Sequence, residues 1–181
     1  MQITFIRHLP TEWNAKTWLQ GRQDIDIIPV NKEVQRKINN NKQQLEKLAP
    51  FELILASTLK RTHQTAEQYG LEVLTEPLLD ELNFGPYEGR PKAELINDKG
   101  EDWLEHPKDL ILGESLVHFE NRILKFLEKY KDSHQILVFG HGSWIRACIS
   151  IVQDGNINGM NQLVVENNEC ITLNIDTHAI L

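Results

Sequence analysis

Three short apolar runs stand out along the chain, and each predicts a buried β-strand. They cover Ile3 to Ile6, Leu53 to Ala56 and Ile136 to Phe139. Longer stretches that predict helices separate and follow them, at 31–48, 58–69, 115–130 and 143–153. Apolar strands set between helices are typical of a parallel sheet covered by helices. We therefore expect an α/β fold, a three-layer sandwich with a mostly parallel central sheet and helices on both faces.

The remaining pattern is less regular. Leu163 to Val165 and Ile171 to Ile175 predict two late strands. The segment from about 86 to 114 is polar and acidic, has no clean period and holds several prolines and glycines, so we predict an irregular excursion over one end of the sheet. No repeat, low-complexity tract or linker divides the chain, and residues 1–181 are expected to form one domain.

Composition narrows the class of protein. The chain has 19 basic and 26 acidic side chains, a formal net charge of −7, and 40% hydrophobic residues. This is a globular composition, and the lack of a Lys/Arg block argues against a nucleic-acid partner. No apolar run reaches the roughly 18 residues of a membrane helix and no signal peptide is recognisable, so we expect a cytoplasmic protein without a membrane partner. Cys148 and Cys170 form no CxxC motif.

Polar residues gather where the three predicted strands end. Arg7-His8 follows the first strand, Ser57 to Arg61 the second, and Gly140 to Ser143 the third. In open α/β sheets, ligands bind beyond the carboxyl ends of the strands, and the helices that begin there add backbone donors for anions. Two histidines with two arginines suit an anion better than a metal, because guanidinium matches phosphate or carboxylate. We expect an anionic substrate and no metal or other cofactor.

If the anion is a phosphoryl group, a neutral imidazole can attack its phosphorus atom, and an acid must then protonate the leaving oxygen. The stretch LLDELNFGPYEGRP offers Asp80, Glu81 and Glu88 beside glycines that allow close packing. The residue types alone leave open which carboxyl group donates the proton.

Five motifs, taken in order, resemble those of the histidine phosphatase superfamily, also called phosphoglycerate-mutase-like. Arg7 to Asn14 resembles the family pattern R-H-G-E-T-x-x-N, and the later motifs follow at the family's spacing. These are Q-G-x-x-D from Gln20, S-x-L-x-R-x-x-Q-T-A from Ser57, E-x-x-x-G with E-G from Glu81, and H-G at His141-Gly142. The resemblance covers most of the chain.

This resemblance implies a role for each matching residue. His8 would be the nucleophile that forms a phosphohistidine, and Glu81 the general acid that later activates water. Arg7, Arg61 and His141 would complete the catalytic set by holding the phosphoryl oxygens. The residues expected to bind the phosphate are Arg7, Asn14, Gly21, Arg61, His141 and Gly142.

The chain departs from the family pattern at Leu9-Pro10, where members usually have glycine and an acidic residue. Glycine tolerates positive φ and lets the backbone approach an oxyanion. Leu9 fits there only if its φ is negative and its side chain points away, since Pro10 also restricts it to extended conformations. Otherwise Leu9 would narrow the mouth of the pocket.

These observations predict a metal-independent phosphomonoester hydrolase that acts on a small phosphorylated metabolite. The chain length resembles that of the α-ribazole-phosphate phosphatases of the family, which suggests that substrate. Mutase-type phosphoryl transfer is the first alternative, disfavoured because the 86–114 segment has few cations: Arg90, Lys92, Lys99 and Lys108. Leu9-Pro10 keeps a non-catalytic phospho-ligand binding module open as the second. The sequence leaves homodimer formation open.

Overall fold

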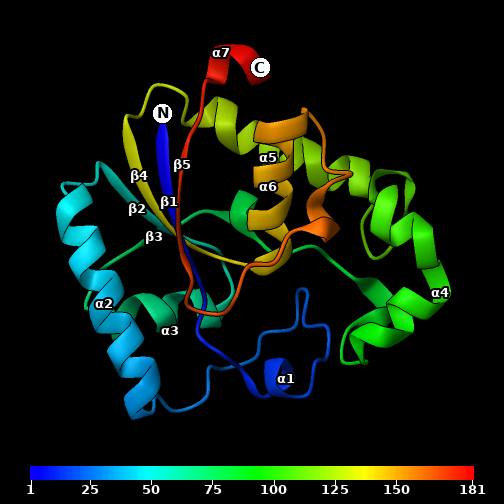
Figure 1. Cartoon of the computed structure of the whole chain (residues 1–181), viewed down its shortest axis with the longest axis horizontal. Coiled ribbons are helices and arrows are strands. Elements are labelled where there is room, and N and C mark those ends of the chain that lie inside the picture. The colour runs from blue at the N-terminus through cyan, green and yellow to red at the C-terminus, as the bar shows by residue number, and fades with distance from the viewer.

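A five-stranded sheet forms the centre of the computed structural model, which describes residues 1–181 (Figure 1). The strands are β1 (Gln2–Arg7), β2 (Leu53–Ala56), β3 (Leu74–Thr75), β4 (Gln135–Gly140) and β5 (Cys170–Asn174). They lie in the order β3-β2-β4-β1-β5, with β5 antiparallel to β1 and every other pair parallel. The expected α/β fold with a mostly parallel sheet is confirmed.

Helices cover both faces of this sheet. They are α1 (Glu12–Ala15), α2 (Lys32–Leu48), α3 (Lys60–Gln68), α4 (Lys92–Glu105), α5 (Leu116–Lys129), α6 (Gly142–Asp154) and α7 (Thr177–Ile180). Four short 3-10 helices join them: η1 (Pro77–Leu79), η2 (Gly85–Tyr87), η3 (Pro107–Asp109) and η4 (Met160–Gln162). Figure 1 shows α2 and α3 on one side of the strands and α5 and α6 on the other. None of the helices is both long and apolar enough to cross a membrane.

Alternation along the strands divides the core into two clusters. Phe5 and Val138 belong to the larger cluster, which includes the apolar stripes of α5 and α6. Ile6 and Phe139, the next residues along the same strands, belong to the smaller cluster under α2 and α3. Because successive strand residues point to opposite faces, this division follows directly from the sequence pattern. The parallel pairing of β4 with β1 and with β2 brings the carboxyl ends of these three strands side by side.

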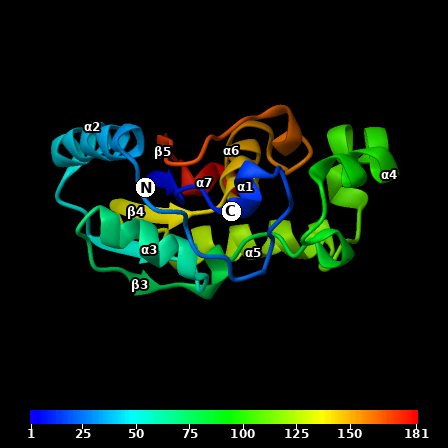
Figure 2. The same cartoon turned by 90° about the horizontal axis from the view of Figure 1, so that it is seen from below.

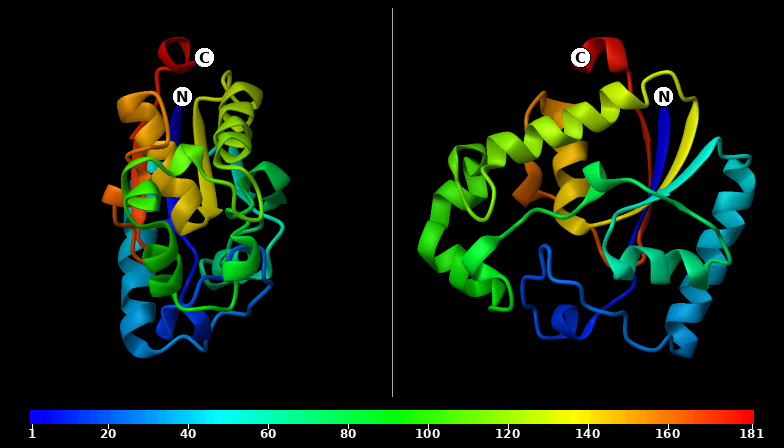
Figure 3. Two further views of the ribbon diagram at one scale, coloured as in Figure 1. Left: turned by 90° about the vertical axis from the view of Figure 1, so that its right-hand side faces the viewer. Right: turned by 180° about the vertical axis from the view of Figure 1, so that it is seen from behind.

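Two predicted segments are wrong. Leu163 to Val165 forms no strand, since Val164 is exposed and the stretch continues from η4 as an extended loop. The 86–114 segment is not wholly irregular, because it contains the 14-residue α4, which Gly100 interrupts at a φ of 51°. That interruption and the proline at its start obscure the helical period. Figure 3 shows α4 standing away from the sheet, at the far end of the molecule.

The segment around α1 lies beyond the carboxyl ends of the strands. Seen from below, it passes in front of the middle of the molecule (Figure 2). Thr11 caps α1, and the side chains of Thr11 and Asn14 form a reciprocal capping box. This capping holds a helix of only four residues in place next to the strand ends.

Leu9 lies in the core and not at the mouth of a pocket. Its side chain is 1% exposed and belongs to the smaller core cluster. Its φ is negative, because Thr17 and Asn168 are the only non-glycine residues with positive φ. The Leu9 N–H donates to Thr65 Oγ1 at 2.9 Å. The interpretation that Leu9 narrows the pocket is therefore wrong, and its side chain anchors the loop instead.

We expect Leu9→Ala to lower the free energy of unfolding by about 2–4 kcal/mol, because it leaves a cavity in the core. Leu9→Met conserves volume and should cost less than about 1.5 kcal/mol. Urea denaturation of both variants measures the difference. A Leu9→Ala protein of wild-type stability would contradict the buried placement.

Candidate active site

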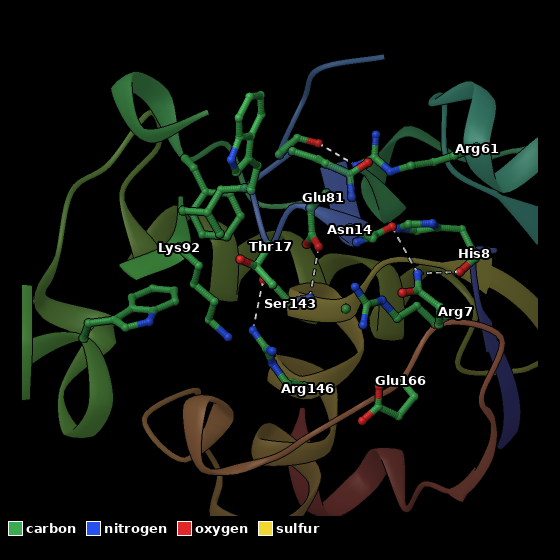
Figure 4. A pocket seen from close by; sticks show the side chains of 18 residues that line it. Arg7, His8, Asn14, Thr17, Arg61, Glu81, Lys92, Ser143, Arg146 and Glu166 are labelled. Carbon is green, nitrogen blue, oxygen red and sulfur yellow. Dashed lines mark hydrogen bonds between the residues drawn. The ribbon is translucent and has the colours of Figure 1, made fainter. Parts of the chain in front are cut away.

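A cavity of about 350 Å³ opens at the carboxyl ends of β1 and β4 (Figure 4). Of the residues that the sequence analysis selected, those lining it are Arg7, His8, Asn14, Gly21, Arg61, Glu81 and Gly142. His141 lies immediately behind the wall, fully buried, with its ring centroid 5.4 Å from that of His8. The structure thus brings all eight selected residues together around one cavity.

The hydrogen bond of His8 defines its tautomer. His8 Nδ1 lies 2.7 Å from the carbonyl oxygen of Leu9. Since a carbonyl can only accept, Nδ1 carries the proton and Nε2 keeps its lone pair. Burial, followed by the positive charges of Arg61 and Arg7, lowers the pKa of His8 well below its ordinary value of 6.5. At neutral pH the ring is therefore an uncharged imidazole with a nucleophilic Nε2.

His141 is oriented by a partner on the neighbouring strand end. Its Nε2 lies 2.7 Å from Ser57 Oγ, and its Nδ1 is buried without a partner. Burial, followed by the charge of Arg61, lowers the pKa of His141 well below 6.5. When the Ser57 hydroxyl donates to Nε2, Nδ1 carries a proton that is free to meet an acceptor.

Backbone carbonyls hold the guanidinium groups of Arg7 and Arg61. Arg7 Nη1 donates to the Val165 oxygen at 2.6 Å, and Arg61 donates to the Gly21 and Gln23 oxygens at 2.8 and 2.7 Å. Neither arginine forms a salt bridge. Burial lowers the pKa of Arg61 to about 10, so both groups remain charged at neutral pH. Carbonyls orient the two cations but do not neutralise them.

Unpartnered donors concentrate at this cavity. Six buried side-chain nitrogen or oxygen atoms in the protein have no hydrogen-bond partner. Four of them belong to the cavity or its immediate wall: Arg7 Nε, Arg61 Nε, Arg146 Nε and His141 Nδ1. Buried donors are rarely left unpaired. An oxyanion in the cavity would supply the missing acceptors.

Among the three candidate carboxylates, only Glu81 lines the cavity. Its Oε2 accepts from the Ser143 N–H at 3.0 Å and its Oε1 from the Trp144 N–H at 3.1 Å, at the start of α6. The expectation that these backbone donors serve the substrate anion therefore does not hold for Ser143 and Trp144. Asp80 instead binds the Thr58 N–H and hydroxyl, and Glu88 binds the Arg22 and Phe84 N–H groups.

Arg122, which the sequence analysis did not select, fixes the segment that carries Glu81. From α5 it donates to the carbonyl oxygens of Leu78, Asp80 and Glu81 and pairs with Glu114. A lone arginine on an amphipathic helix gives no sign of this role in the sequence. Its buried guanidinium donates to three carbonyls of a segment that lacks the hydrogen-bond pattern of an α-helix or a β-sheet.

The smaller selected residues shape the cavity wall. Asn14 Oδ1 accepts from the Thr11 N–H at 3.0 Å, which leaves the amide nitrogen free to donate into the cavity. Gly21 has a φ of +52°, and a Cβ there would lie 2.1 Å from Glu88 Oε1. A Cβ on Gly142 would lie 3.1 Å from Arg7 Nε. Glycine at these two positions permits the close approach of the loops.

Several lining residues escaped sequence analysis as site residues. Lys92 and Arg146 add positive charge, Asn167 donates to the His8 carbonyl at 3.0 Å, and Glu166 adds an acidic side chain. Arg146 lies five positions after His141 on α6, so the spacing after the H-G motif is a signal that could have located it. The others come from irregular segments or helix ends and carry no recognisable pattern.

The fold and the cavity together define an α/β protein with an anion-binding pocket at the carboxyl edge of its sheet. The family model of the histidine phosphatase superfamily, branch 1, matches residues 3–180. The chain therefore belongs to this superfamily.

Named relatives include both phosphatases and mutase-like proteins. The chain is 31% identical to phosphoserine phosphatase 1 of Hydrogenobacter thermophilus, over 81% of this chain and 74% of that protein. It is 28% identical to phosphoglycerate mutase-like protein 4 of Arabidopsis thaliana, over 81% of this chain and 68% of that one. The α-ribazole phosphatase structure from Shigella flexneri has the same fold, with a TM-score of 0.76, 23% identity, and coverage of 97% and 91%.

The two buried histidines predict a loss of stability in mild acid. Because their folded-state pKa values lie below 6.5, the unfolded chain binds more protons than the folded one as pH falls through this value. The free energy of unfolding should fall by up to about 1.4 kcal/mol per pH unit for each histidine.

Denaturation curves between pH 7 and pH 5 in a buffer without oxyanions measure this slope. We expect His8→Gln to reduce it by about one proton's contribution. His134→Gln, which removes an exposed histidine at the opposite end of β4, is the matched control. An unchanged slope in His8→Gln would show that His8 does not titrate as described.

Proposed function

We propose that this protein hydrolyses a phosphomonoester of a small metabolite through a phosphohistidine at His8, without a metal ion. The observation that carries the proposal is the lone pair on His8 Nε2, set beside the buried guanidinium of Arg61 and the partly buried guanidinium of Arg7, neither of which forms a salt bridge. A neutral imidazole is a nucleophile at phosphorus, and positive charge around it favours both substrate binding and the transition state.

The proposed reaction has two steps. His8 Nε2 attacks phosphorus, the bond from phosphorus to the ester oxygen breaks, and Glu81 in its protonated form gives the leaving oxygen its proton. Arg7, Arg61 and His141 hold the non-bridging oxygens during this transfer. In the second step the Glu81 carboxylate takes a proton from water as the water oxygen attacks phosphorus, which frees His8 and releases inorganic phosphate.

The buried placement of Leu9 weighs against a non-catalytic binding module. That alternative rested on the idea that Leu9-Pro10 spoils the geometry of attack. Leu9 instead points into the core, while its carbonyl accepts the bond that leaves His8 Nε2 free. Mutase-type transfer stays an alternative, because Lys92 lines the cavity and relatives include mutase-like proteins.

The proposed substrate class is a small phosphorylated metabolite, and two members of this class are candidates. α-Ribazole phosphate is one candidate, suggested by chain length and by the fold shared with the Shigella flexneri phosphatase. Phosphoserine is another, suggested by the Hydrogenobacter thermophilus relative. A panel that contains both, assayed for released phosphate, compares them directly.

We expect His8→Ala to lower hydrolysis of p-nitrophenyl phosphate by at least about 1,000-fold, because no other group replaces the nucleophile. Rapid acid-free quenching and intact-protein mass spectrometry should detect a phosphoryl adduct in the wild type and none in the variant. A chelator should leave the wild-type rate unchanged. Full activity in His8→Ala, or loss of activity in chelator, would refute the mechanism.

Glu81→Gln should lower kcat by about 100- to 10,000-fold on an alkyl phosphate, whose leaving oxygen needs a proton. The loss should be smaller on p-nitrophenyl phosphate, whose leaving group departs without one. Glu88→Gln serves as the matched control and should affect both substrates by the same factor. If Glu88→Gln showed the leaving-group dependence and Glu81→Gln did not, the proton donor would be misassigned.

A further inference from the structure

Glu81 is held through its backbone as well as through its carboxylate. Two arginines that do not line the cavity donate to its carbonyl oxygen, Arg22 from Nε at 2.6 Å and Arg122 from Nη2 at 3.4 Å. Arg22 lies in the loop between α1 and α2, and Arg122 lies on α5. Two segments far apart in the sequence therefore fix the residue that the proposed reaction uses as its acid.

Arg122 has no donor left for a substrate. Its five N–H groups meet five acceptors, which are the carbonyl oxygens of Leu78, Asp80 and Glu81 and both carboxylate oxygens of Glu114. The side chain is also buried beneath the segment that it holds. Arg122 can therefore act on the reaction only through the position of Glu81.

Arg22 belongs to the loop that also holds Arg61. Its two sequence neighbours, Gly21 and Gln23, supply the carbonyl oxygens that accept from Arg61 at 2.8 and 2.7 Å. The backbone of this loop thus orients a guanidinium of the phosphate-binding set, while the side chain in its middle reaches across to the Glu81 carbonyl. One residue therefore connects the group that would hold the phosphoryl oxygens to the group that would donate the proton.

Carboxylates neutralise both of these arginines. Glu114 pairs with Arg122 at 2.8 Å and with Arg22 at 3.7 Å, and Asp80 pairs with Arg22 at 3.4 Å. A buried cation that has its counter-ion and its hydrogen bonds needs no oxyanion to stabilise it. This distinguishes the pair from the unpaired arginines that line the cavity, and it indicates that the pair holds protein groups in position and does not bind substrate.

We propose that Arg22 and Arg122 are positioning residues for Glu81, and that Arg22 couples the placement of Glu81 to that of Arg61. This inference rests on the proposed function and deepens it. Proton transfer and phosphoryl transfer both need their reacting groups in register, and a misplacement of about 1 Å can cost about 100-fold in rate. The fork of Arg22 would keep the proton donor and the phosphate-binding guanidinium at a fixed separation.

Kinetics with two leaving groups test the positioning of Glu81. The measured quantity is the ratio of kcat/KM for glycerol 3-phosphate over that for p-nitrophenyl phosphate, because only the alkyl leaving group needs a proton. Arg22→Met and Arg122→Lys should each lower this ratio by about 10-fold. The lysine keeps a positive charge beside Glu114, which favours folding, but it has three donors in place of five.

Arg36→Met is the matched control, because it removes an exposed arginine of α2 and should leave the ratio unchanged. A wild-type ratio in Arg22→Met or in Arg122→Lys would overturn the assignment of that arginine as a positioning residue.

Phosphate binding tests the coupling through Arg22. In calorimetry with inorganic phosphate, Arg22→Met should lose about 10-fold in affinity, because the loop that orients Arg61 loses its tie to the Glu81 segment. Arg122→Lys should bind phosphate as the wild type does, since Arg122 makes no hydrogen bond to that loop. Arg22→Lys keeps the charge without the fork and should lose most of the same affinity. Wild-type affinity in Arg22→Met or in Arg22→Lys would contradict the coupling.

Amide hydrogen exchange separates failure of this inference from failure of the proposed function, because it requires no turnover. The Ser143 and Trp144 N–H groups lie in the first turn of α6, where a helix offers them no acceptor, and they donate to the Glu81 carboxylate. Both amides should exchange at least about 10-fold faster in Arg22→Met and Arg122→Lys, while later amides of α6 keep their wild-type rates. Wild-type exchange of both amides in both variants would overturn the positioning role, whether or not the protein hydrolyses phosphomonoesters.

Discussion

The structure depends on the way in which it holds positive charge beside His8. Arg61 is buried and Arg7 is partly buried, and both donate to backbone carbonyls, those of Gly21 and Gln23 for Arg61 and that of Val165 for Arg7, without forming a salt bridge to a carboxylate. A buried guanidinium without a counter-ion is costly, and the cost falls when an oxyanion enters. Burial, and after it the same charges, keep His8 neutral by lowering its pKa. In the proposed reaction, one arrangement would therefore both attract the phosphoryl group and preserve the nucleophile.

Contacts between segments distant in sequence maintain this arrangement. The chain around Val165 to Glu169 runs beside the end of β1, where Asn168 N–H donates to the Arg7 oxygen and Arg7 N–H donates to the Glu169 oxygen. Asn167 adds a bond to the His8 carbonyl. On the opposite wall, Arg122 ties the carbonyls that precede and include Glu81. Hydrogen bonds to backbone groups of irregular loops thus hold the site residues in position, while the two core clusters hold the strands in position.

Much of the fold and of the candidate site could be predicted from the sequence, because periodicity and strand-end chemistry are local signals. The runs that became β1, β2 and β4 are continuous and apolar, and α5 repeats its buried positions without interruption. The residues at these strand ends converge because parallel strands end at one edge. The resemblance to a family then supplied Asn14 and Gly21, which no local pattern would have selected, and it chose Glu81 among the three candidate carboxylates.

What escaped prediction depends on tertiary contacts. The sequence left open whether Leu9 points away from the pocket or narrows its mouth, and only its place in the core decides between the two. The helical period of α4 is obscured by the interruption at Gly100. Lys92 looks like an ordinary surface cation, since nothing near it in sequence shows that it shares a cavity with His8, and Arg146 has only its spacing from His141 as a signal.

A crystal structure with vanadate most directly tests the claim that His8 Nε2 is the nucleophile. We predict vanadium bound to His8 Nε2, with its oxygens on Arg7, Arg61 and His141; vanadate bound elsewhere, or beyond reach of His8 Nε2, would contradict it.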